Sequence, residues 1–468
     1  METADDESFK PNQLGGLLMK EYYVWTDQYD YINIEKLEVV QSMNAHGRAY
    51  VKGIIHEKDK ERYMQSLAKE QWVKILVKDE DGNMAVLFCG MVLQAELEEG
   101  GINTGLTLEL VTGTFLLDKE EHYRVIQKEH YQLEEVIKEI GRCYEDYRYD
   151  MNEQPGNIKG IRVQYQETDW QFLKRLLGEA GYCIIPDCQR KGIRFGINVS
   201  NDGSTNIEEE DFSLLISGDK RKYTVKSRKL HRLGEKAIYR KQVLYIYKIV
   251  TKYLNAECVH EYQLMPKPDV RIPKVANQSV VGCSLPAIVT AVEADKVQVK
   301  FPNNMTGEES DLGKIQTWFG YSTVYSTPTG AGWYCMPEPG DTVRVYFPSD
   351  QEKDAYAISA VHLGNGSQRQ NPERKSIKNI YGKEILLTPH SLVMTNNKGM
   401  TVKLEDEEGI LIESNKDINI MAQGNMVISS AKASVMIAGT ESVALNQGGT
   451  GITIDQDILF NGSEFRIQ

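Results

Sequence analysis

The chain has 468 residues, of which 41% are hydrophobic, and a formal net charge of -13 at pH 7. This length is enough for about three domains, each with a core of its own. The acidic balance, with no cluster of lysine and arginine, argues against a nucleic-acid-binding protein, which would present a basic face.

The first residues, METADDESFKPNQ, are acidic and polar. They lack the positive segment followed by an apolar segment that marks a secretory signal. No apolar run reaches the roughly 18 residues of a membrane helix. We therefore expect a soluble protein that is synthesised in the cytoplasm without a signal peptide. The seven cysteines are scattered without CxxC spacing, so we expect them to be reduced and mostly buried.

From about residue 21 to residue 282 the sequence mixes strand and helix patterns. The segment AVLFCGMVLQAELEEGGINTGLTLELVTGTF alternates apolar and polar residues on both sides of Glu98 to Gly101, which predicts a β-hairpin. The next segment, HYQLEEVIKEIGRCYEDY, predicts a helix whose buried face is formed by Leu133, Val136, Ile137 and Ile140.

A strand, a helix and a second strand are predicted within VQYQETDWQFLKRLLGEAGYCI, residues 163–184. Thr168 and Gln171 form a capping box at the helix start, and Gly181 is a typical C-terminal stop. The buried face is predicted to consist of Trp170, Leu173, Leu176 and Leu177. By itself this string is structural and suggests no chemistry.

Residues 283–363 read as a series of short strands: PAIVTAV, KVQVKF, GWYCM, DTVRVYF and AYAISAV. Turn clusters that contain proline, glycine and asparagine separate them. About five strands in so short a stretch predict a small barrel. A polar linker, residues 364–378, follows.

The last seventy residues repeat a pair of apolar positions about every eight residues, with glycines and asparagines between the pairs. Residues two apart point to the same side of a strand, so each pair predicts a strand fragment with one buried face. The pairs are Ile410 with Ile412, Ile418 with Ile420, Met426 with Ile428, Val435 with Ile437, and Val443 with Leu445. Looser echoes are Ile452 with Ile454, Ile458 with Phe460, and Phe465 with Ile467. The pattern is typical of a β-solenoid or β-prism.

Coils this short leave little room for a core within one chain. We therefore predict that several identical strips, most simply three, close their apolar faces around one axis. The alternative is a disordered tail with scattered aliphatic residues. Disorder usually comes with few β-branched residues, and the regular spacing of isoleucine favours the ordered prism.

Four stretches in a fixed order carry a resemblance to a known family. The first contains Phe88, Gly90 and Val92 as a Phe-x-Gly-x-Val pattern. The second matches at Tyr165, Glu167, Asp169, Phe172, Arg175, Leu176, Leu177, Gly181 and Tyr182. The third, GWYCMPEPGDTVRVYF, matches at Trp333, Pro337, Gly340, Asp341 and Val343, and the fourth is the repeat GILIESNKDINIMAQGNMVISS. Together they resemble the VgrG proteins of type VI secretion and the hub and spike proteins of contractile phage tails.

The resemblance implies a multidomain fold that is mainly β with some helix, combining β and α+β parts. A flexible N-terminus (1–20) would precede a tail-hub-like domain of duplicated β-barrels with helices (21–282) and an OB-type barrel (283–363). The linker (364–378) would then lead into a trimeric β-helix or β-prism spike (379–468). The inward pairs listed above would form the trimer core of this needle, and the matched hub and barrel residues would be structural.

The function implied is that of a homotrimeric central spike and hub of a contractile injection system. It would cap the inner tube at the baseplate, adapt a threefold spike to a sixfold tube and puncture the target envelope mechanically. Implied partners are the hexameric tail-tube proteins, baseplate proteins, a PAAR-like tip protein and an effector. The particle would act outside the producing cell or at the target envelope. The type of machine, its cargo and its target stay open.

Two departures from the family pattern bear on activity. Residues 362–378 are too few to hold the lysozyme that some phage relatives insert between barrel and needle. No histidine follows His390, so the His-x-His iron site found at some spike tips is missing. A separate PAAR-like cone at the tip is a hypothesis that rests on these missing histidines.

The residues themselves predict no catalytic, cofactor or metal site. The densest carboxylate runs are Glu134 with Glu135, Glu208 to Asp211, and Glu405 to Glu408. Paired acids divide acid and base roles only in a cleft with different environments, and runs of adjacent acids are usually solvated. The histidines lie far apart, and no HExxH, GxSxG, Walker or dinucleotide motif occurs. We therefore expect no enzyme.

Base stacking by the barrel aromatics Trp333, Tyr334, Tyr321 and Tyr325 is a further hypothesis, because barrels of this type often bind nucleic acid. The absence of a basic groove favours core or subunit contacts instead. Two alternative functions remain: a tail-associated peptidoglycan hydrolase, and a receptor-binding tail fibre or adhesin.

Overall fold

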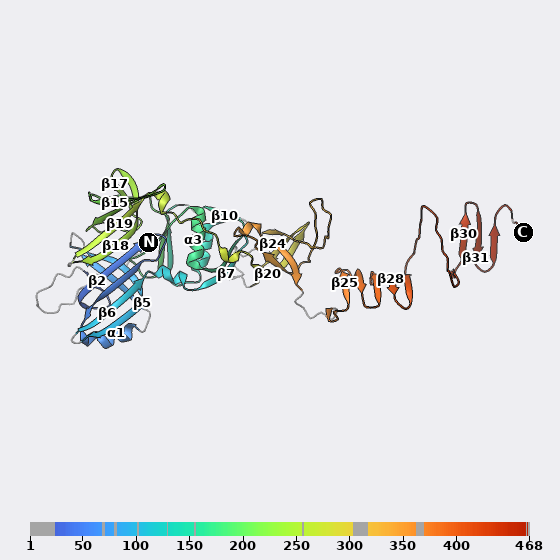
Figure 1. Ribbon diagram of the computed structural model, residues 1–468, viewed down its shortest axis with the longest axis horizontal. Helices are drawn as coiled ribbons and strands as arrows, with labels where there is room; N and C mark the ends of the chain where they lie inside the picture. Colours follow the sequence, from blue (N-terminus) through green and yellow to red (C-terminus); the bar gives the residue numbers. More distant parts are fainter. Residues whose placement is uncertain are drawn as a thin grey trace, which may run out of the picture. The chain divides into compact units, whose positions relative to one another are not determined.

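The computed structural model describes residues 24–67, 71–78, 82–100, 103–128, 130–153, 156–254, 257–302, 317–361, 369–464 and 466. The chain divides into two compact units, Met1–Leu363 and Gly364–Gln468. Both are built mainly from strands in several sheets, with a few helices in the first unit, which confirms the predicted fold class (Figure 1). The expected flexible N-terminus and the last repeat, Phe465 with Ile467, lie outside the described residues. The finer domain boundaries stay a prediction.

The largest sheet of the first unit has twelve strands in the order β1-β4-β5-β6-β3-β2-β18-β19-β16-β15, with β17 and β14 attached beside β18. The strands are β1 (Val24–Thr26), β2 (Tyr31–Ser42), β3 (Arg48–Ile55), β4 (Trp72–Lys78), β5 (Met84–Gly100), β6 (Asn103–Val111), β14 (Thr205–Asn206), β15 (Phe212–Ser217), β16 (Lys220–Ser227), β17 (Lys236–Tyr239), β18 (Gln242–Leu254) and β19 (Glu257–Met265). The order has two ends, β1 and β15, and gives no closure into barrels. The duplicated barrels therefore stay a prediction.

The predicted hairpin is confirmed as β5 and β6, which pair antiparallel up to Gly100 opposite Asn103. Phe88 is fully buried on β5. A Cβ at Gly90 would lie 2.8 Å from the carbonyl oxygen of Val111, so only glycine fits this close approach of the two strands. Helix α1 (Lys60–Leu67) also belongs to this part of the chain, and its Tyr63 is buried.

A second core of the first unit lies between helices and short strands. Its elements are β7 (Glu121–Ile126), β8 (His130–Gln132), α2 (Leu133–Gly141), β9 (Tyr147–Met151), β10 (Asn157–Lys159), β11 (Arg162–Thr168), α3 (Asp169–Ala180), β12 (Ile184–Pro186) and β13 (Ile193–Ile197). β7 pairs with β11, β8 with β10, and β12, β13 and β9 form a three-stranded sheet. The predicted buried faces of both helices are confirmed, with every predicted residue at most 3% exposed.

Helix α3 begins and ends as its sequence predicts. The Thr168 hydroxyl accepts a hydrogen bond from the Gln171 N–H, and the Gln171 side chain accepts one from the Thr168 N–H, both at 3.2 Å. Gly181 ends the helix with φ +76°, a left-handed conformation that glycine adopts without strain. These local interactions fix the position of α3 relative to β11.

The region predicted as a small barrel contains a five-stranded sheet in the order β22-β21-β20-β23-β24. Its strands are β20 (Ser284–Glu293), β21 (Lys296–Lys300), β22 (Trp318–Gly320), β23 (Thr342–Tyr346) and β24 (Tyr356–Val361). Four of the predicted strands are confirmed, but GWYCM is not a strand. Its Trp333 and Tyr334 are 52% and 73% exposed, and the strand in its place is β22, which the sequence analysis missed.

The core of this five-stranded sheet extends into neighbouring elements. Val125 of β7 and Val163 of β11 are fully buried in the same apolar cluster as Phe301 and Val345. The Gln127 side chain donates to the Val299 carbonyl at 2.8 Å, and the Thr317 hydroxyl donates to the Gln127 carbonyl at 2.6 Å. The sheet therefore packs on the β7–β11 ribbon and shares a core with it.

The second unit contains two antiparallel meanders. The first is β25 (Lys375–Lys378), β26 (Glu384–Leu387), β27 (Ser391–Thr395), β28 (Met400–Glu405) and β29 (Gly409–Ser414). The second is β30 (Val443–Gln447), β31 (Thr450–Ile454) and β32 (Ile458–Asn461). Residues 415–442 form no strand, and Figure 1 draws them as a plain trace.

The expectation that every apolar pair forms a strand fragment is therefore wrong for three pairs in the single chain. These are Ile418 with Ile420, Met426 with Ile428, and Val435 with Ile437. Their second members are well exposed: 70% for Ile420, 69% for Ile428 and 66% for Ile437. The physical reason is that a strand is defined by hydrogen bonds to a neighbour, and no strand among the described residues pairs with these segments.

Candidate functional site

The candidate site is the apolar face of the two meanders in the second unit. In the first meander the register places one residue from each strand in a row: Ile377, Ile385, Met394, Val402 and Ile412. A second row, two residues along each strand, consists of Lys375 at the edge followed by Leu387, Leu392, Leu404 and Ile410. Residues two apart point to the same side of a strand, so both rows lie on one face.

This face is open in the single chain. Ile410 is 72% exposed and Ile412 57% exposed. On the opposite face the row between them reads Ser376, Leu386, Val393, Lys403 and Leu411, and the next row is polar. One face is thus continuously apolar from β26 to β29, with Lys375 at its edge, and the other face is mixed. A continuous apolar patch of this kind marks an interaction site in a folded protein.

The second meander repeats the arrangement. One row is Val443, Ile454 and Ile458, and the other is Leu445, Ile452 and Phe460. Leu445 and Phe460 are 58% and 54% exposed. Both meanders therefore present two adjacent apolar rows that the described part of the chain leaves largely uncovered.

The spacing of apolar residues predicts part of this face. Four of the ten predicted core residues lie in the rows: Ile410, Ile412, Val443 and Leu445. Strands β25 to β28 were missed, although EILL, SLVM and TVKLE alternate in the same way as the predicted pairs.

The other six predicted core residues are not brought into any row by the single chain. They lie within residues 415–442 and are 47–70% exposed, so the expected buried positions are open here: Ile418, Ile420, Met426, Ile428, Val435 and Ile437. No strand of the described chain lies on either side of them, so their apolar side chains stay largely open. That the ten residues form the core of a trimer stays a prediction.

Polar contacts fix the start of the first meander. The Glu384 carboxylate is 6% exposed and lies 3.4 Å from Arg374 and 3.5 Å from Lys378. The Asn397 amide donates to it at 3.3 Å. Burial tends to raise the pKa of Glu384, but this hydrogen bond and the two cations outweigh burial and lower it. The charged carboxylate therefore ties the loops of β25, β26 and β27 together.

The matched hub residues Glu167 and Asp169 are the acidic partners of two buried arginines. Both oxygens of Glu167 accept from Arg175 at 2.8 Å, and Arg175 also donates to Glu352 at 2.7 Å. Side-chain exposure is 4% for Arg175, 11% for Glu167 and 8% for Glu352. Because Glu352 belongs to the segment between β23 and β24, this buried triad joins α3 to the five-stranded sheet.

Asp169, the first residue of α3, is fully buried and satisfied by four groups. Arg124 of β7 pairs with it, Tyr144 donates at 2.7 Å and Gln164 at 2.9 Å, and His122 lies 3.5 Å away. Burial, followed by the hydrogen bond to Asp169, raises the pKa of Tyr144. The network anchors α3 to β7, β11 and the end of α2, and no cleft opens onto it among the described residues.

The other matched residues lie as expected for structural roles. Phe172, Leu176 and Leu177 are fully buried on α3, and the Tyr165 carbonyl accepts from Asn277 at 2.8 Å. In the barrel motif Pro337 and Val343 are buried, and Gly340 has φ +99°. The Asp341 carboxylate accepts from the Glu338 N–H at 2.8 Å and closes the Pro-x-x-Gly-Asp turn. Trp333 lies on an exposed loop instead of a strand.

The carboxylate runs do not converge in the described part of the chain. Glu134 pairs with Lys138 and Glu135 with Lys128, each at 2.8 Å. Among the described residues no group of three or more histidine, cysteine, aspartate or glutamate side chains is placed to hold a metal ion. The cysteines are free, but the expectation that most are buried is wrong, because only three of the seven are.

Comparison with known proteins relates part of the first unit to a known family. Residues 69–190 match the family model of the phage tail baseplate hub (GPD). No curated protein matches the chain significantly in sequence.

Among solved structures, a similar one is the E. coli c3393 protein, a type VI secretion component with structural similarity to the bacteriophage T4 tail proteins gp27 and gp5. It is 12% identical, with a TM-score of 0.51, and the match covers 72% of this chain and 99% of that one. The Francisella PdpA-VgrG complex matches in its lidded form at 9% identity and a TM-score of 0.56, covering 82% of this chain and 76% of that one. The lidless form of the PdpA-VgrG complex matches at 9% identity and a TM-score of 0.53. This match covers 81% of this chain and 93% of that one.

The chain has the fold of the VgrG and phage tail hub-and-spike family. The resemblance inferred from the four sequence stretches is thus confirmed. The tail-hub match includes β5, α2 and α3, which carry two of these stretches. The tail-hub family match, together with this fold, supports a hub or spike role in contractile injection. No helix among the described residues is long and apolar enough to span a membrane.

Proposed function

We propose that this chain is the homotrimeric central spike and hub of a contractile injection system. The single observation that carries the proposal is the pair of open apolar faces in the second unit. In the first meander alone, nine large apolar side chains lie in two rows on one face. Exposing half of each would forgo roughly 1 kcal/mol per residue, so a partner that covers the rows is strongly favoured.

Identical copies are the simplest cover for these faces. A cyclic assembly buries the same rows of every chain around one axis without leaving a copy uncovered. Three copies suit a hub that adapts to a sixfold tube, which the family resemblance implies. The ten predicted core residues would then be buried around this axis, and the six among them that lie in residues 415–442, including Ile420, Ile428 and Ile437, would find strand partners in the neighbouring chains.

In this proposal the first unit caps the inner tube at the baseplate, and the second forms the needle that punctures the target envelope. A closed prism of paired strands has no free edge and resists unfolding under axial load. The protein would act by stiffness, without catalysis, a cofactor or nucleic acid. A PAAR-like tip protein, an effector and baseplate proteins are further proposed partners, and the assembled particle would act outside the producing cell.

The test is the mass of the full chain in solution, measured by light scattering, with one pair of matched variants. Ile412→Asp places a carboxylate in the central apolar row, and Leu411→Asp places the same group one residue away on the opposite face of β29. Burying one charge per chain near a shared axis costs roughly several kcal/mol of free energy per ion. We expect wild type and Leu411→Asp to be trimers and Ile412→Asp to dissociate. A wild-type chain that is folded and monomeric would refute the proposal.

A further inference from the structure

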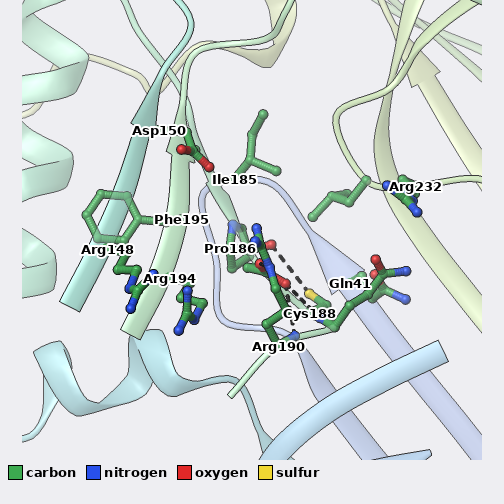
Figure 2. A pocket seen from close by; sticks show the side chains of 14 residues that line it. Gln41, Arg148, Asp150, Ile185, Pro186, Cys188, Arg190, Arg194, Phe195 and Arg232 are labelled. Atoms are coloured by element: carbon green, nitrogen blue, oxygen red, sulfur yellow. Dashed lines mark hydrogen bonds and ion pairs between the residues drawn. The ribbon is translucent and has the colours of Figure 1, made fainter. Parts of the chain in front are cut away.

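A hollow of about 630 Å³ opens in the first unit beside the sheet of β12, β13 and β9 (Figure 2). Four arginines line it: Arg148, Arg190, Arg194 and Arg232. Its lining carboxylates are Asp150 and Asp187, so the wall carries a net positive charge in a chain whose net charge is -13. The size is within the usual range of ligand pockets, roughly 300–1000 Å³.

The sheet itself holds two of these arginines side by side. Arg194 of β13 and Arg148 of β9 are ladder partners in parallel strands. Like charges opposite each other destabilise a sheet. Asp146 offsets part of this repulsion, lying 2.9 Å from Arg194 and 3.9 Å from Arg148, but it is one carboxylate for two guanidinium groups.

The other two arginines come from loops. Arg190 pairs with Asp187 at 2.5 Å, and its side chain is 65% exposed. Arg232 is exposed, and in the described part of the chain only its backbone groups take part in hydrogen bonds. In Figure 2 Arg148 and Arg194 lie on one side of the hollow and Arg232 on the other, with Arg190 between them. An anion inside would have guanidinium donors on several sides.

The floor and walls of the hollow provide open space, apolar surface and a hydrogen-bond acceptor. Gly196 is the ladder partner of both Ile185 and Asp150, and a Cβ there would meet nothing closer than 3.8 Å. The missing side chain leaves the centre of the hollow open between the two neighbours. Ile185 and Leu233 offer apolar surface. Asp150 makes no ion pair or side-chain hydrogen bond with the described residues and is available as an acceptor.

We propose that this hollow is a binding site for an acidic peptide segment of a partner protein. The arginines take the carboxylates of the segment through charge-assisted hydrogen bonds. Asp150 accepts a peptide N–H, and the apolar wall takes an aliphatic side chain. A phosphate group fits less well, because it offers mainly acceptors at neutral pH and would leave Asp150 facing like charge. All lining residues belong to one chain, so the inference does not depend on the trimer proposed above.

The experiment measures binding of a fluorescein-labelled peptide that alternates glutamate and leucine to the full chain by fluorescence anisotropy. A peptide with glutamine in place of glutamate is the charge control. The affinity is expected to fall as salt is added, because the contacts are partly exposed. Inorganic phosphate and a single-stranded oligonucleotide are added as competitors, and neither is expected to displace the peptide.

Two variants and one control locate the site. Arg232→Gln leaves no partner unpaired, and loss of one charged donor should weaken binding on the order of tenfold. Gly196→Leu fills the floor and should abolish binding. The control is Arg142→Gln, which removes an exposed arginine at the end of α2 that lies outside the hollow. Near-ultraviolet circular dichroism checks that each variant is folded.

Three results would overturn the assignment. The first is an absence of peptide binding by the wild-type chain. The second is equal affinity of Arg232→Gln and Arg142→Gln, and the third is displacement of the peptide by phosphate or the oligonucleotide at matched concentration. The last outcome would make the hollow a phosphate site.

Discussion

Replacing Arg175 by methionine removes the cation that holds two buried glutamates together. Its guanidinium makes four hydrogen bonds: two to Glu167 and one to the Val163 carbonyl, each at 2.8 Å, and one to Glu352 at 2.7 Å. Methionine fills a similar volume but offers no donor. Two carboxylates that are 11% and 8% exposed are then left without a counter-charge.

Removing one partner from a buried ion pair typically costs about 3–5 kcal/mol, because the remaining charge is neither paired nor hydrated. We expect a loss of this size in the local stability of α3 and of its contact with the five-stranded sheet. Glu352→Gln should be milder, about 1–2 kcal/mol, since an amide oxygen still accepts from Arg175 and the pair with Glu167 is kept.

The pH dependence gives the effect a definite sign. Burial raises the pKa of Glu167 above its ordinary 4.5, and Arg175 opposes that rise only in part. A carboxyl whose pKa is raised on folding stabilises the fold below the unfolded pKa, and that contribution is lost as the pH rises through the folded pKa. Without Arg175 the folded pKa rises further. The deficit of Arg175→Met should therefore be larger at pH 8 than at pH 5.

Because the chain contains two compact units, a single unfolding free energy is not defined, and the assay has to be local. Hydrogen exchange of peptides covering α3, corrected for intrinsic rates at each pH, provides it. The matched control is Arg162→Met, which removes a pair between β11 and Glu179 of α3, where the carboxylate is 39% exposed. That loss should be about 1 kcal/mol or less. Equal loss of protection in both variants, or a deficit of Arg175→Met that shrinks towards pH 8, would refute the reasoning.

Two further changes test local features. Gly181→Ala should destabilise the end of α3 by about 1–2 kcal/mol. The cost comes from the backbone, because φ is +76° while a Cβ would meet nothing closer than 3.9 Å. The control Gly156→Ala, where φ is not positive, should show no change in hydrogen exchange. Burial, followed by the charge of His231, lowers the pKa of His260 to about 4, and its ring bonds Thr251 at 2.7 Å. Thermal stability should therefore fall between pH 6.5 and 4, where the unfolded histidine takes up a proton that the folded one refuses. An unchanged pH slope in His260→Gln melts would contradict this assignment.

Local patterns predicted local structure well. The β5–β6 hairpin, helices α2 and α3 and the Thr168 capping box follow from residues within a few positions of one another. GWYCM failed as a strand although its aromatics have high strand propensity, because the loop around Gly330 and Gly332, both with positive φ, turns them outward. β-propensity measures packing on a sheet, and these two side chains are exposed instead of packed.

Long-range partners could not be predicted from the sequence. Arg175 and Glu352 are 177 positions apart, and neither carries a local signal that names the other. Similarly, the spacing of Ile418 and Ile420 predicted one buried side, but a strand also needs a hydrogen-bonded neighbour, which the pattern of one chain does not specify. The exposed rows and residues 415–442 thus share one physical feature, which is that no other described segment of the chain pairs with or covers them.

The shared core explains how a spike of this design would carry load between its parts. Val125 and Val163 belong to the β7–β11 ribbon, yet they are fully buried among side chains of the five-stranded sheet. The Arg175 triad ties α3 to the same sheet through Glu352. A force on the β7–β11 ribbon and α3 would therefore reach the five-stranded sheet through packed side chains, which compress little. It would not depend on the connecting backbone alone. Substitutions in this buried contact should weaken the coupling between the β7–β11 ribbon with α3 and the five-stranded sheet, while each keeps its own strands. Substitutions on the apolar rows of the two meanders should change only assembly.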